Sequence, residues 1–321
     1  MFYLYIILLV ILMSRTKGKR FADKETSKQL KKERKKRQER HEKYNFILDN
    51  THHSSAPQSE YNQVGKKTKK KQKRKNAIFN IIIFICVGVI IFSSYNIVNW
   101  FIDNENNKKL LNSIHDQVSV TQEEVTVDNK KIKKYHYDLS KLLSQNSDTV
   151  GWVSVSNTNI DYPVVQATDN DYYLNHSFDR TQNTAGWVFA DYRSNCSHLG
   201  YNTVIYGHNR KDQSMFGSLQ TVLKEDWYAD EDNLYIHFST LNEDHVYRIF
   251  STFICNDEHV SAYTQTDFSN EQEFNNYIQK LAGCSSRDYG TDISETKQII
   301  TLYTCYGINN QRLLVCATLV D

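Results

Sequence analysis

A cysteine and an arginine stand close together near the end of this sequence and could serve one reaction. Residues 301 to 320 read TLYTCYGINNQRLLVCATLV, with Cys305 just before a turn and Arg312 just after it. A thiolate is a strong nucleophile, and a guanidinium can stabilise the negative charge that develops on a carbonyl oxygen. The same two residues also suit a small core side chain and an arginine at a strand end, so the pair alone does not decide between catalysis and structure.

A histidine could complete such a site, because a nucleophilic thiol needs a partner that accepts or supplies a proton. The chain has 11 histidines, and most lie among polar residues, where a solvated surface role is the default. His208 differs because it ends the strand-like run NTVIYGH and precedes a polar loop. Position alone favours ordinary hydrogen bonding for such a residue over catalysis.

The remaining cysteines indicate which other thiol chemistry is open to the chain. Cys86 lies in a long apolar stretch, and the five others are Cys196, Cys255, Cys284, Cys305 and Cys316. Five is an odd number, so at least one of these thiols has no intramolecular partner, while a disulfide among the other four stays open. No C-x-x-C pair or clustered Cys and His spacing indicates zinc, and no motif indicates any other metal or an organic cofactor.

Residues 136–321 consist mostly of short apolar runs separated by polar turns, such as VGWVSV, IDYPVV, TVIYGH, LYIHF and QIITLYT. Short strands rich in Val, Ile, Tyr and Phe at this spacing predict an all-β barrel or sandwich. One stretch has helical periodicity instead, over about 270 to 282, with Ser269 as the expected N-cap, Gln272 three residues later and Gly283 as the stop. Its expected buried face is Phe274, Tyr277, Ile278 and Leu281.

Residues 77–98, AIFNIIIFICVGVIIFSSYNIV, carry no charge over a length that matches a bilayer-spanning helix. Trp100 and Phe101 follow where an aromatic interface anchor is expected. A shorter apolar segment, residues 1–13, is either a signal-type or interfacial segment or the result of a start that belongs at Met13. The sequence therefore predicts a single membrane span, at 77–98.

Residues 14–76 hold 22 Lys and Arg against 7 Asp and Glu, so the net charge of +2 hides a strong asymmetry. Their low apolar content predicts a disordered segment. A run such as KKTKKKQKRK could bind nucleic acid, but its place directly before the span favours the positive-inside rule, which predicts a cytosolic tail and an outward domain. Residues 99–135 are expected to form a stalk or helical lead-in, and 136–321 the outer domain.

The ordered set of motifs in the outer domain resembles the sortases, membrane-anchored cysteine transpeptidases of Gram-positive bacteria, and is most similar to class B. The resemblance runs from about residue 138 to 320 and is carried by DTVGWVSVSNTNIDYPVVQATDNDYYLNHSFD (148 to 179), GWVFADYRS (186 to 194), NTVIYGHN (202 to 209) and TLYTC with Arg312. It implies a closed β-barrel of about eight strands, with a helix in the loop between strands six and seven. It also implies that Cys305 is the nucleophile, that His208 protonates the leaving amine, and that Arg312 faces the oxyanion or the substrate backbone.

The resemblance further implies a peptide groove lined by Asn170, Leu174, Tyr206 and Tyr303. The chain departs from the family pattern at Tyr303, where a small residue is common, at Arg210, where Met is frequent, and at Cys316, where a polar residue is frequent. A large Tyr303 could narrow the groove, and Cys316 could be a buried bystander or an oxidation partner of Cys305.

The function implied by the resemblance is a cysteine transpeptidase at the plasma membrane, with its catalytic domain on the cell-wall side. It would cleave a C-terminal sorting signal after Thr and join the protein to an amine of a lipid-linked cell-wall precursor or a pilin lysine. Three alternatives stay open: a catalytically silent binding or assembly module, a surface cysteine peptidase that releases its product to water, and a membrane-tethered nucleic-acid binder.

Overall fold

The computed structural model describes residues 32–42, 59–127, 129–307 and 310–321, and it divides into two compact units, Met1–Cys86 and Val87–Asp321. The prediction for residues 1–13 and much of that for 14–76 therefore lie outside the described residues. Within the basic tail, residues 32–42 and the segment from Ser59 onward are helical rather than disordered. Lys, Arg, Glu and Gln are strong helix formers, so low apolar content did not exclude a helix here.

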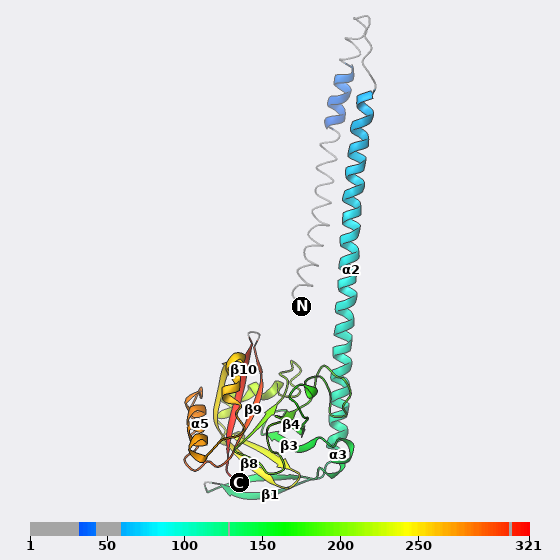
Figure 1. Ribbon diagram of the computed structural model, residues 1–321. Coiled ribbons are helices and arrows are strands. Elements are labelled where there is room, and N and C mark those ends of the chain that lie inside the picture. The colour runs from blue at the N-terminus through cyan, green and yellow to red at the C-terminus, as the bar shows by residue number, and fades with distance from the viewer. Residues whose placement is uncertain (1–31, 43–58, 128, 308–309) are drawn as a thin grey trace, which may run out of the picture. The chain divides into compact units, whose positions relative to one another are not determined.

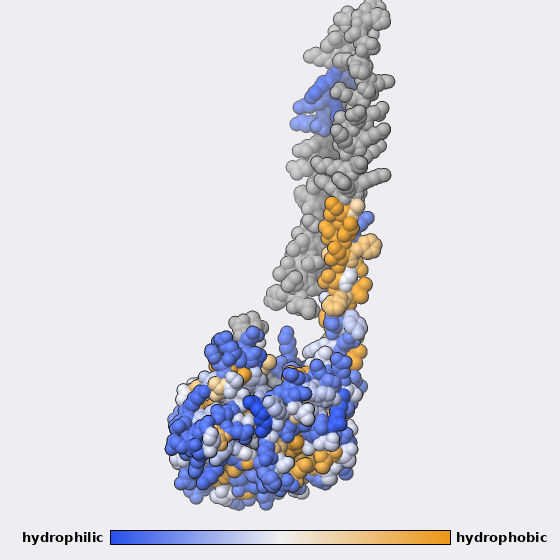
Figure 2. Space-filling model, in the orientation of Figure 1, coloured by the Kyte–Doolittle hydropathy of each residue, from blue (hydrophilic) through white to orange (hydrophobic). Residues whose placement is uncertain are grey.

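The longest helix is α2 (Ser59–His115), which includes the segment predicted to span the membrane (Figure 1). Its stretch from Ala77 to His115 is long and apolar enough to cross a bilayer. Large apolar side chains between Ile78 and Ile102 are exposed, and they form the band of hydrophobic residues along the helix in Figure 2. A bilayer would cover such a band, since the protein itself does not.

A β-hairpin follows α2, made of β1 (Val120–Val127) and β2 (Lys130–Tyr137). The sequence analysis expected only a stalk or helical lead-in here. The strands were not predicted because most of their side chains are exposed, and many are polar or charged. Lys131 and Glu124 form one ion pair between them, with Nζ and Oε2 2.8 Å apart. Asn129, in the turn, has a φ of 65°, which suits a tight hairpin connection.

The remaining strands form one closed barrel in the order β10-β8-β7-β3-β4-β5-β6-β9. The prediction of a closed barrel of about eight strands is confirmed. The strands are β3 (Thr149–Val155), β4 (Asp161–Val165), β5 (Phe189–Ala190), β6 (Asn202–Tyr206), β7 (Tyr235–Thr240), β8 (Asp244–Asn256), β9 (Ile299–Tyr306) and β10 (Gln311–Leu319).

Short helical elements connect the strands. They are α3 (Ser140–Gln145), η1 (Tyr172–Leu174), η2 (Gly217–Leu223), α4 (Glu225–Tyr228), η3 (Glu231–Asn233), η4 (Asp257–Tyr263) and α5 (Glu271–Gly283). The barrel interior is filled by large side chains such as Trp152, Trp187 and Phe238, which are fully buried. This packed interior leaves the strand ends and the connections as the places where a substrate could bind.

Helix α5 lies between the sixth and seventh barrel strands, β8 and β9, as predicted. Its four expected apolar residues are buried, and they pack in a cluster with Phe250, Phe253 and Leu314 of the barrel. The N-cap is Asn270, however, and not Ser269. The Asn270 Oδ1 accepts from the Glu273 backbone N–H at 2.9 Å, while Ser269 contributes only its own backbone N–H, which donates to the Glu273 carboxylate at 2.8 Å. Asn and Ser are both good caps, so spacing alone misplaced this one by a residue.

Replacement of the observed N-cap should weaken the fold more than replacement of its neighbour. We expect Asn270→Ala to lower the free energy of unfolding by about 1 kcal/mol, because the first turn of α5 loses its side-chain acceptor. Ser269→Ala serves as the matched control and should change stability by less than about 0.5 kcal/mol. Urea denaturation of residues 99–321, followed by circular dichroism, compares the two variants. Equal losses for both would contradict the assignment of Asn270 as the cap.

Candidate active site

Cys305 and Arg312 lie opposite one another on neighbouring strands. Strands β9 and β10 are antiparallel, and their register pairs Cys305 with Arg312 directly. Paired residues place their side chains on the same face of a sheet, so the thiol and the guanidinium share one surface of the barrel. The Cys305 side chain is exposed, whereas Arg312 is half-buried. The turn between the strands therefore does what the sequence predicted and folds residue 312 back beside residue 305.

His208 reaches the same end of the barrel through the parallel pairing of β6 with β9. The last pair of this ladder is Tyr206 with Tyr303, so His208 and Cys305 each follow two residues beyond it. The two segments remain hydrogen-bonded beyond the last strand pair, because the Asn209 side-chain amide donates to the Cys305 carbonyl at 2.7 Å. Gln220 in turn donates to Asn209 Oδ1 at 2.8 Å. The structure thus brings together the three residues predicted to be catalytic.

The imidazole of His208 has a defined orientation. Its Nε2 lies 2.8 Å from the backbone carbonyl oxygen of Leu174, at the end of η1. A carbonyl can only accept, so Nε2 donates the proton of this hydrogen bond. In the neutral ring this leaves Nδ1 as the basic nitrogen, which could take a proton from one group and return it to another.

The guanidinium of Arg312 is held by two side chains that accept from it. Nε donates to the Tyr303 hydroxyl at 2.7 Å, and Nη2 lies 3.0 Å from an Asp257 carboxylate oxygen. Burial would lower the pKa of Arg312, but the acidic groups of Tyr303, Cys305 and Asp257 raise it overall. Burial raises the pKa of the Tyr303 phenol to about 12, although Arg312 opposes this shift. Nη1 donates to the Gln311 carbonyl, so the hydrogen bonds to described residues leave two of the five N–H groups for a substrate oxygen.

The residues predicted to line a peptide groove differ in their surroundings: one side chain is exposed, and the others form hydrogen bonds or ring contacts. The Leu174 side chain is exposed, while its carbonyl holds His208. Tyr206 and Tyr303 pack edge to face, with ring centroids 4.9 Å apart. Asn170 and Tyr206 do not simply face outward, because both donate to one carboxylate oxygen of Asp191, at 3.0 and 2.7 Å.

Asp191 is a buried carboxylate that the sequence analysis did not single out. Its side chain is 0% exposed, and its two oxygens accept from Arg193 Nε at 2.8 Å and Arg193 Nη2 at 2.7 Å, besides the two groups named above. Burial favours the neutral acid, but the hydrogen bonds from Arg193 and Tyr206 outweigh it and lower the pKa of Asp191. The sequence ADYRS could have indicated this ion pair, because it places an aspartate two residues before an arginine at the end of a strand.

Of the other cysteines, Cys255 pairs with Arg312 across the β8–β10 ladder, whereas Cys316 lies farther along β10. All six are free, and Cys316 is fully buried, with a pKa that burial raises to about 12. Cys316 pairs with Thr301 in the β9–β10 register, four residues from Cys305 and roughly 13 Å along the strand. The interpretation of Cys316 as an oxidation partner of Cys305 is therefore wrong, since a disulfide needs Cα atoms less than about 7 Å apart.

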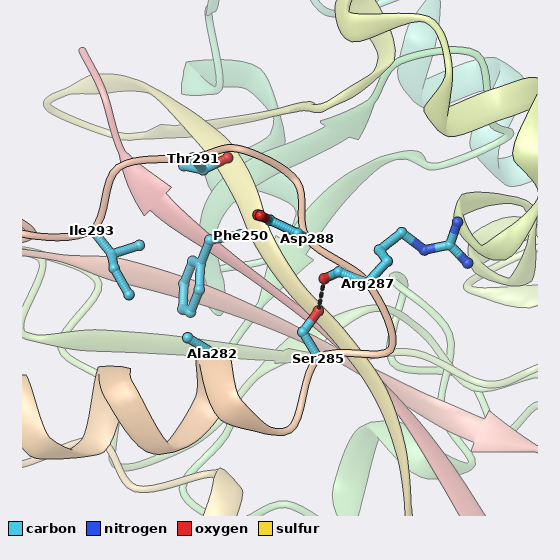
Figure 3. Close-up of a pocket in the computed structure, with 7 residues that line it drawn as sticks. All are labelled: Phe250, Ala282, Ser285, Arg287, Asp288, Thr291 and Ile293. Carbon is cyan, nitrogen blue, oxygen red and sulfur yellow. Dashed lines mark hydrogen bonds between the residues drawn. The ribbon is translucent and has the colours of Figure 1, made fainter.

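A cavity of about 330 Å³ lies elsewhere, between the end of α5, strand β8 and the loop that follows α5 (Figure 3). It is lined by Phe250, Ala282, Ser285, Arg287, Asp288, Thr291 and Ile293, none of which was predicted as a site residue. The Arg287 guanidinium points away from it and stacks on Tyr228, 3.5 Å from the ring centroid. In the described part of the chain, no group of three or more His, Cys, Asp or Glu side chains is placed to hold a metal ion.

A family profile described as a sortase domain matches residues 153–320. The chain belongs to the sortase family. It is 32% identical to sortase B of Listeria monocytogenes over 73% of this chain and 92% of that protein, and 28% identical to sortase B of Staphylococcus aureus over 77% and 98%. Its predicted resemblance to class B is thereby confirmed.

Solved structures of class B sortases share the barrel. Sortase B from Bacillus anthracis superposes with a TM-score of 0.56 at 31% identity, over 69% of this chain and 99% of that one. A Staphylococcus aureus sortase B–substrate complex superposes with a TM-score of 0.52 at 27% identity, over 71% and 98%. Sortases are cysteine transpeptidases associated with membranes, and this sortase has a helix able to cross one.

The buried carboxylate of Asp191 should contribute strongly to stability. We expect Asp191→Asn to lower the free energy of unfolding by about 2 kcal/mol at neutral pH, because the hydrogen bonds from Arg193 and Tyr206 lose their charged acceptor. The folded-state pKa of Asp191 is lowered, so this stabilisation is present above the ordinary pKa of about 3.9 and is lost as the pH falls through the folded value. The difference in free energy of unfolding between wild type and variant, measured by urea denaturation, should therefore become smaller below about pH 4. A gap independent of pH would contradict this account.

Proposed function

We propose that this sortase cleaves a sorting signal after Thr through a thioacyl intermediate on Cys305 and then transfers the acyl group to an amine. The observation that carries the proposal is the convergence of an exposed thiol, an oriented imidazole and a guanidinium at one end of the barrel, from β9, the loop after β6, and β10. Each group meets a separate need of acyl transfer: a nucleophile, a proton carrier and a positive charge at the developing oxyanion.

The first half of the reaction forms the thioester. The Cys305 thiolate attacks the Thr carbonyl carbon, and the carbonyl π electrons move to oxygen, where the free N–H groups of Arg312 stabilise them. The tetrahedral intermediate collapses, the C–N bond breaks, and the leaving nitrogen takes from Nδ1 of His208 the proton that the Cys305 thiol gave up to it when the thiolate formed. His208 keeps its Nε2 proton throughout, on the Leu174 carbonyl.

The second half repeats these steps with a new amine. The incoming amine attacks the thioester carbon and loses its extra proton to His208 Nδ1. The C–S bond then breaks, and the thiolate of Cys305 leaves with its electron pair. The result is one new amide bond and an enzyme returned to its starting protonation state.

The substrates we propose are surface proteins or pilins that carry a C-terminal sorting signal, and the acceptor is an amine of a lipid-linked cell-wall precursor or a pilin lysine. The sorting signal would lie in a groove near Asn170, Leu174, Tyr206 and Tyr303. The basic residues before the span support a cytosolic tail and a catalytic domain on the cell-wall side of the plasma membrane. A similar protein, sortase B of Staphylococcus aureus, has been solved as a substrate complex.

A catalytically silent binding module is the second candidate, and the engagement of Arg312 is the observation in its favour. Tyr303 and Asp257 occupy two of its nitrogens, and a small residue is usual in the family where Tyr303 stands. If these contacts kept Arg312 away from the substrate, a sorting signal could bind without being cleaved.

Intact-mass spectrometry separates these two candidates. Residues 99–321 are incubated with a panel of sorting-motif peptides, with and without an amine acceptor. We expect an acyl adduct on the domain that resolves onto the amine, and none with Cys305→Ala. Cys316→Ala is the matched thiol control and should keep the adduct. A folded domain whose Cys305 reacts with iodoacetamide but with no peptide would instead support the binding module, and product release independent of amine would support a peptidase.

The phenol of Tyr303 gives a second test. If it holds Arg312 in a productive position, Tyr303→Phe should lower kcat about fivefold with little change in KM, because one hydrogen bond to the guanidinium is lost while the ring stays. Steady-state transfer assays on residues 99–321 measure both constants. Faster turnover by the variant would show that Tyr303 restrains Arg312 and would contradict the positioning role.

A further inference from the structure

The part of α2 that follows the predicted span packs one polar face against the catalytic domain. Trp100, Asp103, Asn104 and Asn107 recur at the spacing that puts side chains on one face of a helix, and Asn107 is buried. The same face continues with apolar residues that pack against the barrel core, Leu110, Leu111 and Ile114. The apolar residues are enough to attach the helix, so the polar ones need another explanation.

Three of the polar contacts end on one turn, residues 183–186. The Asn107 Nδ2 donates to the Gly186 carbonyl at 3.3 Å, and its Oδ1 accepts from Asn183 Nδ2 at 2.8 Å. The Asp103 carboxylate accepts from the Thr184 hydroxyl at 2.6 Å. Asn183 Oδ1 also accepts from the Ala185 backbone N–H at 2.9 Å, so the helix and the turn form one connected network. A buried amide costs free energy unless it is hydrogen-bonded, and both ends of Asn107 are.

This turn lies directly against His208. Gly186 has a φ of 59°, and a Cβ placed on it would lie 2.9 Å from Cδ2 of His208 and 2.8 Å from the Leu174 carbonyl oxygen. That carbonyl is the acceptor that orients the imidazole. A small shift of residues 183–186 would therefore either press on the imidazole ring or move its hydrogen-bond acceptor.

A second link joins the helix to the chain segment that carries His208. Arg210, two residues later, is buried, and it donates to the Asn104 side-chain oxygen. Its guanidinium also lies over the Trp100 ring, 5.7 Å from the centroid. The helix thus contacts two segments next to His208, the turn 183–186 and the chain at Arg210.

We propose that one face of α2, formed by Trp100, Asp103, Asn104 and Asn107, positions the catalytic histidine, so that the helix segment directly after the predicted span contributes to the active site. Asn107 is the central positioning residue, and it acts on His208 through Gly186 and the Leu174 carbonyl. The proposal rests on the proposed function for the role of His208, but the arrangement itself can be measured without a substrate.

The test uses the full chain in detergent micelles and compares Asn107→Leu with the matched control Asn106→Leu. Asn106 is the adjacent residue on the exposed face of the helix. We expect Asn107→Leu to lower kcat for peptide transfer about 10- to 100-fold, with KM changed less than about twofold, because misplacement of a catalytic group by about 1 Å has effects of this size. Asn106→Leu should leave both constants unchanged.

A second readout is the tautomer of His208, taken from the nitrogen chemical shifts of its ring in protein with ¹⁵N-labelled histidine and assigned with His208→Ala. The unaltered chain and Asn106→Leu should show the Nε2–H tautomer, whereas Asn107→Leu should show a mixture of the two. If the unaltered chain transfers no peptide, the proposed function fails, while the tautomer still decides this inference.

If Asn107→Leu does not fold, Asp103→Ala replaces it, since this change removes only the Thr184 contacts at the surface. It should have a smaller effect in the same direction on kcat and on the tautomer. A folded variant, of either kind, that keeps both the kcat and the Nε2–H tautomer of the unaltered chain overturns the proposal.

Discussion

The parallel pairing of β6 with β9 is the constraint on which the site depends. The two strands are far apart in the sequence, with β7, β8 and α5 between them, yet their register places His208 and Cys305 equally far beyond the last pair. A shift of one residue would turn alternate side chains to the opposite face of the sheet. Asn209 and Thr304 hold the register at this end, through bonds to the Cys305 and Gly207 carbonyls at 2.7 Å each. The connection through β7, β8 and α5 supplies the length that a parallel crossover requires.

Charge around the site is arranged in two separate pairs. In the pair of Asp191 with Arg193 the carboxylate is buried and the guanidinium is 40% exposed, and the carboxylate holds the side chains of Asn170 and Tyr206. In the pair of Asp257 with Arg312 the carboxylate is the exposed partner, at 46%, so water weakens that pair and leaves the guanidinium able to exchange partners. The first pair therefore stabilises residues predicted to contact the substrate, while the second keeps a positive charge near the thiol without fixing it completely.

The sequence predicted the parts of the molecule that depend on local pattern. Cys305 and Arg312 could be placed side by side because only a short turn separates them, and α5 could be predicted because its apolar residues repeat with helical spacing. The hairpin of β1 and β2 was missed because its exposed, charged strands carry no apolar alternation. Asp191 was missed for another reason: its importance comes from Asn170, Arg193 and Tyr206, which only the folded chain brings to it. Asn107 likewise has no local pattern that marks it, since its partners lie almost 80 residues away.

The docking of α2 also sets a distance. Asn107 lies about nine residues beyond Val98, the end of the predicted span, and an α-helix rises 1.5 Å per residue, so roughly 14 Å of helix separates the docking turn from the edge of the apolar core of the bilayer. That length is about twice the thickness of the headgroup layer on one side of a bilayer. The domain would then stay close to the bilayer surface, where membrane-held reactants reach it by lateral diffusion. The length of this helix would therefore limit how far from the bilayer surface the domain can meet its reactants.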